Sequence, residues 1–227
     1  MPRLSILIPY RDRLAHLRQF VPWMYDFFGR SIDFQILVIL QDDELLFNRG
    51  KLLNVGFSLF KSPSSYFCFH DVDMLPLDDS CDYSEPTAFT HLAGRAEQFG
   101  FALPYDSYLD GVLLSTQDEF EKVNGFSNEF WGYGYEDDDL FHRIELLKLD
   151  YRRRLGCFRS LPHPKSTNTE ANGLRCLRWR HGGSVEACIT GDGLDSLRYE
   201  VTKTEPLGHY LGIGYAREVD QVVSVRL

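Results

Sequence analysis

Two clusters of acidic residues have the spacing that a metal-dependent active site needs. Asp71 and Asp73 are separated by one residue. On an extended segment this spacing places both carboxylates on one side, where hard oxygen ligands can bind Mg²⁺ or Mn²⁺. The second cluster, Glu136 to Asp139, consists of four consecutive acids. A helix N-terminus offsets part of their mutual repulsion, and one of these carboxylates can act as a general base toward a hydroxyl group.

An aromatic segment rich in glycine comes directly before the second acidic cluster. Residues 131–135 read WGYGY. Helix capping alone does not call for such a segment. Aromatic rings stack on the apolar faces of sugars while nearby carboxylates accept hydrogen bonds from the hydroxyls, and glycines allow a loop to move. The pattern therefore favours a carbohydrate site.

Basic residues that can meet a diphosphate lie at two predicted junctions. Arg11 and Arg13 follow the first predicted strand, and Arg49 opens the second predicted helix. Arg49 is equally compatible with an ordinary solvated helix face. His163 stands alone, and a lone histidine is more often structural than a ligand. Spacing by itself therefore leaves both roles open for Arg49 and His163.

The elements that position these residues follow from apolar runs and periodicity. Continuous apolar runs predict buried strands at Leu4–Pro9, Phe34–Leu40 and Tyr66–His70. Helical spacing between them predicts a helix that is capped by Asp12 and reaches Phe28, and a second over 49–61, with Pro22 expected to kink or split the first. The first 75 residues thus predict the order β-α-β-α-β and a parallel α/β layer. The Asp71–Asp73 pair would follow the third strand, at the sheet edge where such folds bind ligands.

Beyond residue 75 the pattern is less regular. Leu75–Gln98, rich in Asp, Ser, Pro and Thr, is predicted to be surface loop, and Leu161–Gly183 a long polar loop of the kind that forms a lid. The other predicted elements are strands at Phe99–Pro104, Gly111–Ser115, Ser196–Thr202 and Val219–Val225, and helices at Gln117–Asn124 and Glu136–Lys148.

Composition and charge exclude several classes of function. The chain has 227 residues, which suits one domain, and its net charge of −9 argues against general binding of nucleic acid or anionic membranes. No apolar run approaches the roughly 18–20 residues of a transmembrane helix, and no signal peptide precedes the first strand. Five cysteines without C-x-x-C spacing predict reduced thiols. We therefore expect a cytoplasmic enzyme of bacterial type.

Six segments, in order along the chain, resemble the β-1,4-galactosyltransferase family. They are Pro9–Arg13, FNRGKLLNVGF (47–57), FHDVDMLPL (69–77), FGFALPYDSYLDGV (99–112), NGFSNEFWGYGYEDDDLFHR (124–143) and GDGLDSLRYEV (191–201). The resemblance implies a GT-A-type nucleotide-sugar-binding fold, with a central mostly parallel sheet flanked by helices and a long mobile loop. It implies one catalytic domain over 1–227, with a donor half at about 1–110 and an acceptor half at 111–227 that carries the lid loop 161–183.

The same resemblance implies a role for each matching residue. Asp73 and His163 match metal ligands, with Mn²⁺ as the implied cofactor and Mg²⁺ as an alternative. Asp137 matches the catalytic base. The implied donor-binding residues are Pro9, Arg11, Arg13, Phe47, Arg49, Asp71, Tyr108, Tyr133 and Glu136. The implied acceptor-binding residues are Tyr133, Asp137 and Asp138.

The activity implied by the resemblance is inverting transfer of galactose from UDP-galactose to a hydroxyl of a sugar acceptor. The acceptor would be of the GlcNAc or xylose type and the linkage β-1,4. Tyr108 matches a tyrosine that favours galactose over N-acetylgalactosamine, so transfer of N-acetylgalactosamine or another UDP-sugar is the alternative. A metal-dependent hydrolase does not account for the aromatic segment. An inactive carbohydrate-binding domain does not account for the joint presence of Asp73, Asp137 and His163.

Three positions depart from the family pattern. Asp110 stands in a Leu-Asp-Gly segment where the family has aromatic-Gly-Gly, and we expect it to alter the acceptor side. Ser160 replaces a methionine that is a metal ligand in the N-acetylglucosamine-specific enzymes. Tyr135 replaces a small or basic residue beside the acids. Only Asp73 and His163 therefore remain as expected protein ligands of the metal.

Overall fold

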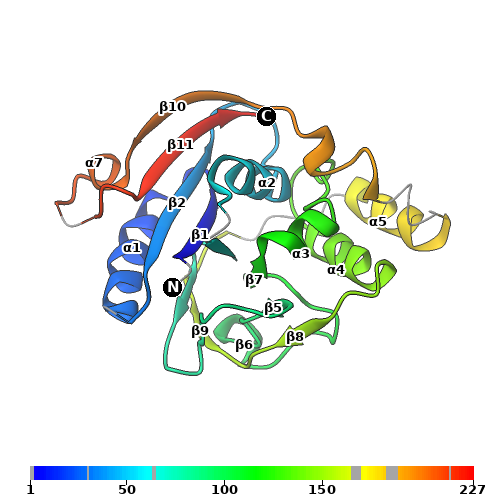
Figure 1. The fold of residues 1–227 in the computed structure, drawn as a ribbon, viewed down its shortest axis with the longest axis horizontal. Helices are drawn as coiled ribbons and strands as arrows, with labels where there is room; N and C mark the ends of the chain where they lie inside the picture. Colours follow the sequence, from blue (N-terminus) through cyan, green and yellow to red (C-terminus); the bar gives the residue numbers. More distant parts are fainter. Residues whose placement is uncertain (1–2, 30, 63–64, 165–169, 183–188, 215) are drawn as a thin grey trace.

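The computed structural model of the protein describes residues 3–29, 31–62, 65–164, 170–182, 189–214 and 216–227 (Figure 1). Within these ranges the largest unit is an eight-stranded sheet. Its strands are β1 (Arg3–Tyr10), β2 (Phe34–Gln41), β3 (Ser65–His70), β5 (Phe89–His91), β7 (Val112–Thr116), β8 (Tyr151–Arg153), β10 (Glu200–Pro206) and β11 (Gln221–Arg226). They lie side by side in the order β10-β11-β2-β1-β3-β7-β5-β8.

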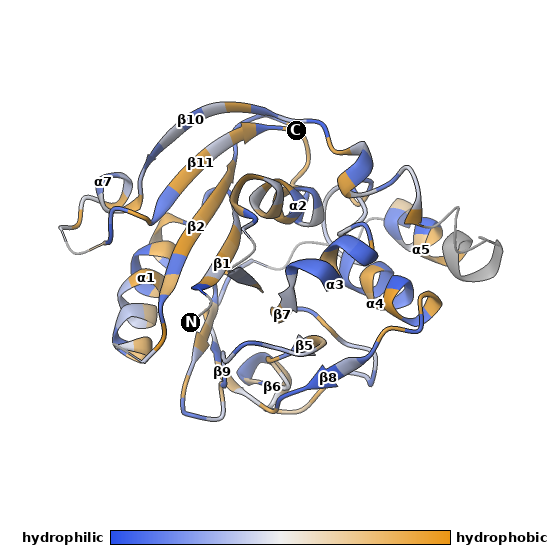
Figure 2. Ribbon diagram, in the orientation of Figure 1, coloured by the Kyte–Doolittle hydropathy of each residue, from blue (hydrophilic) through white to orange (hydrophobic). Residues whose placement is uncertain are grey.

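The centre of this sheet is parallel. Strand β1 lies between β2 and β3 and runs parallel to both, and β11 runs parallel to β2. Antiparallel pairs occur further out, between β3 and β7 and between β10 and β11. Figure 2 shows hydrophobic residues along β1 and β2, as expected of strands that are covered on both faces. The predicted α/β class with a mostly parallel sheet is confirmed.

Helices cover both faces of the sheet. Helix α1 (Leu14–Phe28) packs its buried residues in one core cluster with Ile6 and Ile8 of β1. Helix α2 (Arg49–Phe60) packs in the other cluster, with Leu7 of the same strand. Because side chains alternate along a strand, these two clusters lie on opposite faces.

The remaining helices follow the second half of the chain. Helices α3 (Gln117–Lys122) and α4 (Glu136–Leu146) contribute Phe120, Leu140 and Ile144 to the core cluster of α2. Helix α5 (Glu170–Gly182) lies next to α4 (Figure 1). The short helices are η1 (Glu97–Phe99), η2 (Leu194–Ser196) and α7 (Leu207–Leu211).

A small second sheet brings two distant segments together. Its strands are β4 (Met74–Pro76), β9 (Cys157–Ser160) and β6 (Arg95–Ala96), in the order β4-β9-β6. Strands β4 and β9 are antiparallel, with Met74 opposite Ser160, and the Leu161 amide donates to the Asp73 carbonyl at 2.8 Å. This pairing sets the residues after Ser160 beside Asp73.

Several sequence predictions for these segments were wrong. Pro22 lies inside α1 without splitting it, since one face of the helix is held by core packing on both sides of the proline. Leu75–Gln98 is not a surface loop, because it contains β4, β5 and β6 and buries Tyr83 and Phe89. Phe99–Pro104 is not a strand; its start belongs to the 3₁₀ helix η1.

The predicted lid loop Leu161–Gly183 contains helix α5, which its polar composition concealed. Its residues 165–169 and 183 lie outside the described ranges. Cys68, Cys81 and Cys157 are thiols without a disulfide. In the described part of the chain, no helix has both the length and the apolar character needed to cross a membrane.

Candidate active site

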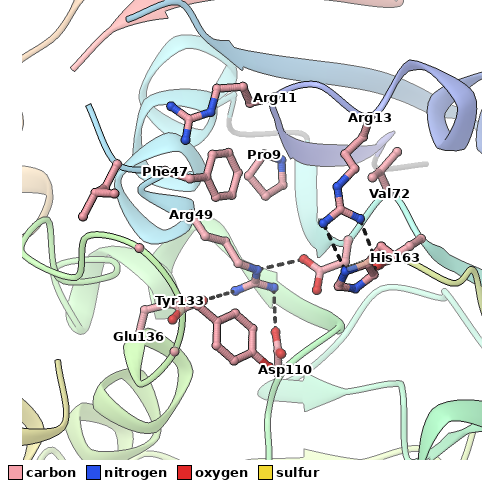
Figure 3. Close-up of a pocket in the computed structure, with 15 residues that line it drawn as sticks. Pro9, Arg11, Arg13, Phe47, Arg49, Val72, Asp110, Tyr133, Glu136 and His163 are labelled. Atoms are coloured by element: carbon pink, nitrogen blue, oxygen red, sulfur yellow. Dashed lines mark hydrogen bonds and ion pairs between the residues drawn. The ribbon is translucent and has the colours of Figure 1, made fainter. Parts of the chain in front are cut away.

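A cavity of about 680 Å³ opens at the carboxyl ends of β1 and β3 (Figure 3). The segments that line it follow β1, begin α2, follow β3, precede β7, begin α4 and follow β9. Its lining residues are Pro9, Arg11, Arg13, Leu46, Phe47, Arg49, Asp71, Val72, Asp73, Asp110, Gly132, Tyr133, Gly134, Glu136 and His163. The position matches the ligand-binding edge of open α/β sheets.

Asp73 and His163 form a pair with the donor atoms of a metal site. Asp73 Oδ2 lies 3.0 Å from His163 Nε2. Two ligands at right angles on an ion with bonds of about 2.1 Å are about 3.0 Å apart, so the pair fits adjacent positions on a divalent cation. Among the described residues, no group of three or more His, Cys, Asp or Glu side chains could hold a metal. The Ser160 hydroxyl contacts the Gln98 amide instead, at 3.4 Å.

The second nitrogen of His163 has two partners that favour different tautomers. Nδ1 lies 2.8 Å from the Pro164 carbonyl and 3.1 Å from Arg13 Nη2. A proton on Nδ1 suits the carbonyl and leaves the Nε2 lone pair for a cation, the arrangement typical of metal-binding histidines. A proton on Nε2 suits Asp73 and lets Nδ1 accept from Arg13. The residues present therefore fit a metal, which would select the first tautomer.

Arg49 joins three carboxylates from three segments. Its Nε donates to Asp71 Oδ1 at 2.8 Å, and its two other nitrogens lie 3.2 Å from Asp110 Oδ1 and 3.6 Å from Glu136 Oε1 (Figure 3). Burial lowers the Arg49 pKa, but the three carboxylates outweigh burial and raise the pKa well above its ordinary value. Arg49 is therefore a fixed positive charge that holds these acids together.

The acids that open α4 have separate surroundings. Glu136 faces Arg49, whereas Asp139 accepts from Arg143 Nε at 2.7 Å in a fully buried pair. Asp138 makes a hydrogen bond with the Tyr105 hydroxyl, which helps to raise the Tyr105 pKa after the larger effect of burial. The four acids predicted as one cluster thus have different partners.

Asp137 differs from its neighbours in having no hydrogen-bond donor among the described residues, although it is only 8% exposed. Burial raises its pKa well above the ordinary value, and the carboxylates of Asp110, Glu136 and Asp138 add to the rise. A carboxylate that holds its proton more tightly than usual is a stronger base. Asp137 therefore has the electrostatics of a general base.

Buried asparagines on α2 position the segment that leads to α4. Asn48 caps α2 by accepting from the Lys51 amide at 2.9 Å, and its Nδ2 donates to the Asn128 carbonyl at 2.8 Å. Asn54 bonds both the amide and the carbonyl of Phe126, at 2.9 and 2.7 Å. These bonds explain why a helix that begins with Arg49 carries buried polar residues.

The Asn172 side chain of helix α5 bonds to the backbone of the aromatic segment. The Nδ2 atom of Asn172 lies 3.1–3.4 Å from the carbonyl oxygens of Trp131, Tyr133 and Gly134, and Asn172 is 3% exposed. A Cβ atom on the neighbouring Gly173 would lie 3.3 Å from the Tyr135 hydroxyl and 3.4 Å from its ring. Tyr135 therefore packs directly against the α5 backbone.

The structure brings most of the predicted site residues to this cavity. Pro9, Arg11, Arg13, Phe47, Arg49, Asp71, Asp73, Tyr133, Glu136 and His163 line it. Tyr108, Asp137 and Asp138 are not part of its lining, but Asp137 lies close enough to Asp110 and Glu136 for their charges to raise its pKa. The individual roles of these residues stay predictions.

Sequence reasoning did not single out four of the lining residues. Each of these residues is next in sequence to a predicted site residue, and this adjacency is the signal that could have identified them. They are Leu46, Val72, Gly132 and Gly134. Asp110, which was expected to alter the acceptor side, lines the cavity and contacts Arg49, and its effect on the acceptor stays a prediction.

The fold and the site define a glycosyltransferase with the GT-A fold. A family model for the N-terminal region of glycosyl transferase group 7 matches residues 1–85, and one for the N-terminal domain of galactosyltransferase matches residues 90–167. The chain belongs to the β-1,4-galactosyltransferase family, glycosyltransferase family 7.

Curated and structural relatives agree with this family. β-1,4-Galactosyltransferase 2 of Cricetulus griseus is 38% identical over 87% of this chain, and human β-1,4-galactosyltransferase 1 is 35% identical over 88%. The chain spans about half the length of these relatives, 55% and 51%. A mutant of Drosophila β-1,4-galactosyltransferase 7, solved with manganese, UDP-Gal and xylobiose, aligns with a TM-score of 0.82 and 30% identity, over 100% of this chain and 94% of that one.

Proposed function

We propose that the protein transfers galactose from UDP-galactose to a hydroxyl of a carbohydrate acceptor, with inversion at the anomeric carbon and a β-1,4 linkage in the product. The observation that carries the proposal is one cavity that joins the Asp73–His163 pair to the carboxylates held by Arg49, with Asp137 next to them. The structural relative bound to manganese, UDP-Gal and xylobiose supports the same choice of ligands.

The β-1,4 linkage in this proposal rests on the family to which the chain belongs. The choice of galactose is supported by Tyr108, which is 7% exposed and packs edge-on against Phe99 and Tyr105 at centroid distances of 5.5 and 5.4 Å. The preference for galactose over N-acetylgalactosamine implied by Tyr108 therefore rests on the family resemblance and on the fixed position of this ring. An acceptor of the GlcNAc or xylose type and a cytoplasmic location remain predictions.

The donor nucleotide would occupy the end of the cavity formed by residues after β1 and before α2. Pro9 and Phe47 offer apolar surface for the uracil ring, and the Arg11 guanidinium lies 5.5 Å from the Phe47 ring centroid (Figure 3). Arg13 reaches toward Asp73, with 3.9 Å between Nη1 and Oδ2. A diphosphate near the metal pair would therefore meet Arg13 as a positive partner.

Asp73 and His163 would hold the Mn²⁺, through Oδ2 and Nε2. When bound, the ion neutralises negative charge on the leaving UDP. Asp137 accepts the proton of the acceptor hydroxyl, whose oxygen then attacks the anomeric carbon from the side opposite UDP and inverts it. Arg49 keeps Asp71 and Glu136 in place during this step, since it contacts both.

The test is a transfer assay with purified protein, Mn²⁺ and a panel of UDP-sugars and sugar acceptors. We expect UDP release from UDP-galactose that depends on an acceptor and on the metal. If UDP-galactose gives no release with any acceptor while another UDP-sugar does, the donor assignment is wrong. Hydrolysis of donors without transfer would point to a hydrolase instead.

The metal assignment is tested with His163→Ala. Loss of one of two protein ligands should raise the Mn²⁺ concentration for half-maximal activity at least about 10-fold. His209→Ala is the matched control, because that side chain is 80% exposed and lies on α7, away from the cavity. A metal titration of His163→Ala that coincides with the control would refute the ligand role.

A further inference from the structure

Asp110 places a carboxylate oxygen in the cavity that the site described so far does not use. Its Oδ1 accepts from the Gly111 amide at 2.8 Å and faces Arg49 Nη2 at 3.2 Å. Its Oδ2 accepts no hydrogen bond from the described residues, and the side chain is 24% exposed where it lines the cavity (Figure 3). One half of the carboxylate is therefore anchored and the other half is open to a ligand.

The backbone around Asp110 is held by buried groups behind the cavity wall. The Asp110 carbonyl lies 3.0 Å from Nε2 of His91, which is buried. Burial lowers the His91 pKa to about 4, and the nearby Arg153 charge lowers it as well, so the ring is neutral at pH 7 and its Nε2–H can donate to the carbonyl. Arg153 donates to the Tyr108 carbonyl at 2.9 Å.

A bond to the end of β3 fixes the same segment from the front. The Asp71 amide donates to the Gly111 carbonyl at 2.9 Å, so the Asp110–Gly111 turn and Asp71 move as one unit. Asp71 and Asp110 then share Arg49 between them. The open oxygen of Asp110 is thus pre-organised beside residues assigned to the donor sugar.

The chemistry of this oxygen selects its partner. An ionised carboxylate only accepts hydrogen bonds, and the neutral parts of a UDP-sugar that donate them near Arg49 are the sugar hydroxyls. A phosphate oxygen carries negative charge and would be repelled.

We propose that Asp110 is a specificity-determining residue that accepts a hydrogen bond from a hydroxyl of the donor sugar through Oδ2. The proposal rests on the proposed function, because it takes the donor to be a UDP-sugar. The proposal predicts that Asp110 forms one hydrogen bond to the donor sugar that a glycine at position 110 could not form.

Asp110→Asn tests the contact with little change in shape. The amide oxygen can keep the contacts to Gly111 and Arg49, while the amide nitrogen replaces the charged acceptor, so the sugar hydroxyl can no longer donate to a carboxylate there. Loss of a hydrogen bond to a charged group corresponds to about 10- to 100-fold in affinity. Equilibrium binding of UDP and of UDP-galactose, both with Mn²⁺ and without acceptor, should show that loss for UDP-galactose and none for UDP.

Deoxy analogues of UDP-galactose identify the hydroxyl. For the analogue that lacks the partner hydroxyl, wild type and Asp110→Asn should bind equally well. Asp106→Asn is the control, an exposed acid in the same segment whose side chain does not line the cavity. Its affinities should equal those of wild type.

Three results would overturn the proposal. They are an unchanged affinity of Asp110→Asn for UDP-galactose, an equal loss for UDP and UDP-galactose, and a loss confined to the KM of the acceptor. The last result would assign Asp110 to an acceptor hydroxyl. Failure of the proposed function is a separate outcome, seen as wild-type protein that transfers no galactose; the binding comparison is then made with the UDP-sugar that wild type does transfer.

Discussion

The carboxylates around the cavity differ chiefly in what faces them. Glu136 and Asp71 face Arg49, and Asp139 faces Arg143. Asp137 is buried without a donor or a cation in contact among the described residues. A buried charge without a partner costs free energy, so an ionised Asp137 lowers the free energy of unfolding of the protein.

At this scale the first prediction concerns Asp137→Asn and activity. The amide cannot accept a proton, so kcat should fall by about 10²- to 10⁴-fold. Binding of UDP with Mn²⁺ should be unchanged, since Asp137 is outside the cavity lining. Near-normal turnover of the variant would show that Asp137 is not the base. Asp118→Asn, an exposed acid on α3, is the control.

The same variant carries a prediction for stability against pH. The folded-state pKa of Asp137 is raised by burial, so ionising it costs stability as the pH rises through that pKa, at about 1.4 kcal/mol for each unit of the shift. Asp137→Asn avoids this cost. Urea unfolding should show no gain below about pH 3, where the carboxyl is protonated in both states, and a gain that grows as the pH rises above the unfolded pKa of about 3.9. A gain that is independent of pH would contradict the assignment.

At the scale of elements, the sequence patterns were informative where an element is long and fully buried. Strands β1, β2 and β3 follow from continuous apolar runs. Strands β4, β6 and β8 have only two or three residues and carry no period to detect. Helix α5 escaped detection because its sequence lacks a continuous apolar face; Leu174 and Leu177 are both 52% exposed.

The docking of α5 gives the second prediction. Asn172→Ala removes the amide group that donates to the carbonyl oxygens of the aromatic segment (residues 131–135). We expect this to lower local stability by about 1 kcal/mol. Hydrogen exchange of residues 131–135 and of α5 should become faster, with little change in the exchange of β1. Leu174→Ala, an exposed change on the same helix, should leave the exchange of 131–135 unaltered. Equal exchange in both variants would mean that Asn172 does not hold α5 in place.

At the scale of the whole molecule, Arg143 links segments that are far apart in sequence. It pairs with Asp139 on its own helix and with Asp192, and it donates to the carbonyl oxygens of Val123 and Asp192. Asp192 in turn accepts from the Asn128 amide at 2.7 Å. The start of α4, the segment before it and the residues before η2 are therefore tied to one buried cation.

Arg143→Met gives the third prediction. It leaves Asp139 and Asp192 buried without their cation, which should lower the free energy of unfolding by about 3–5 kcal/mol. Denaturant unfolding measures the change. Arg152→Met, an exposed arginine on β8, should change it by less than about 0.5 kcal/mol. Equal stability of the two variants would show that the buried network contributes nothing.

The site as a whole was only partly predictable. The acids after β3 and at the start of α4 could be found, because each follows a strong local pattern. The contact of Asp73 with His163 depends on the pairing of β4 with β9, two short strands from distant segments. Only the assembled molecule shows that Asp110 lies against Arg49.

The hydrogen bonds that fix the backbone around Asp110 have an evolutionary consequence. His91 and Arg153 bond to carbonyl oxygens of this segment, so these two bonds do not depend on which side chain stands at position 110. An aspartate codon becomes an asparagine or glycine codon by a change of a single base. If Asp110 contacts the donor sugar as proposed, a single base change would alter that contact while the backbone bonds from His91 and Arg153 stay in place.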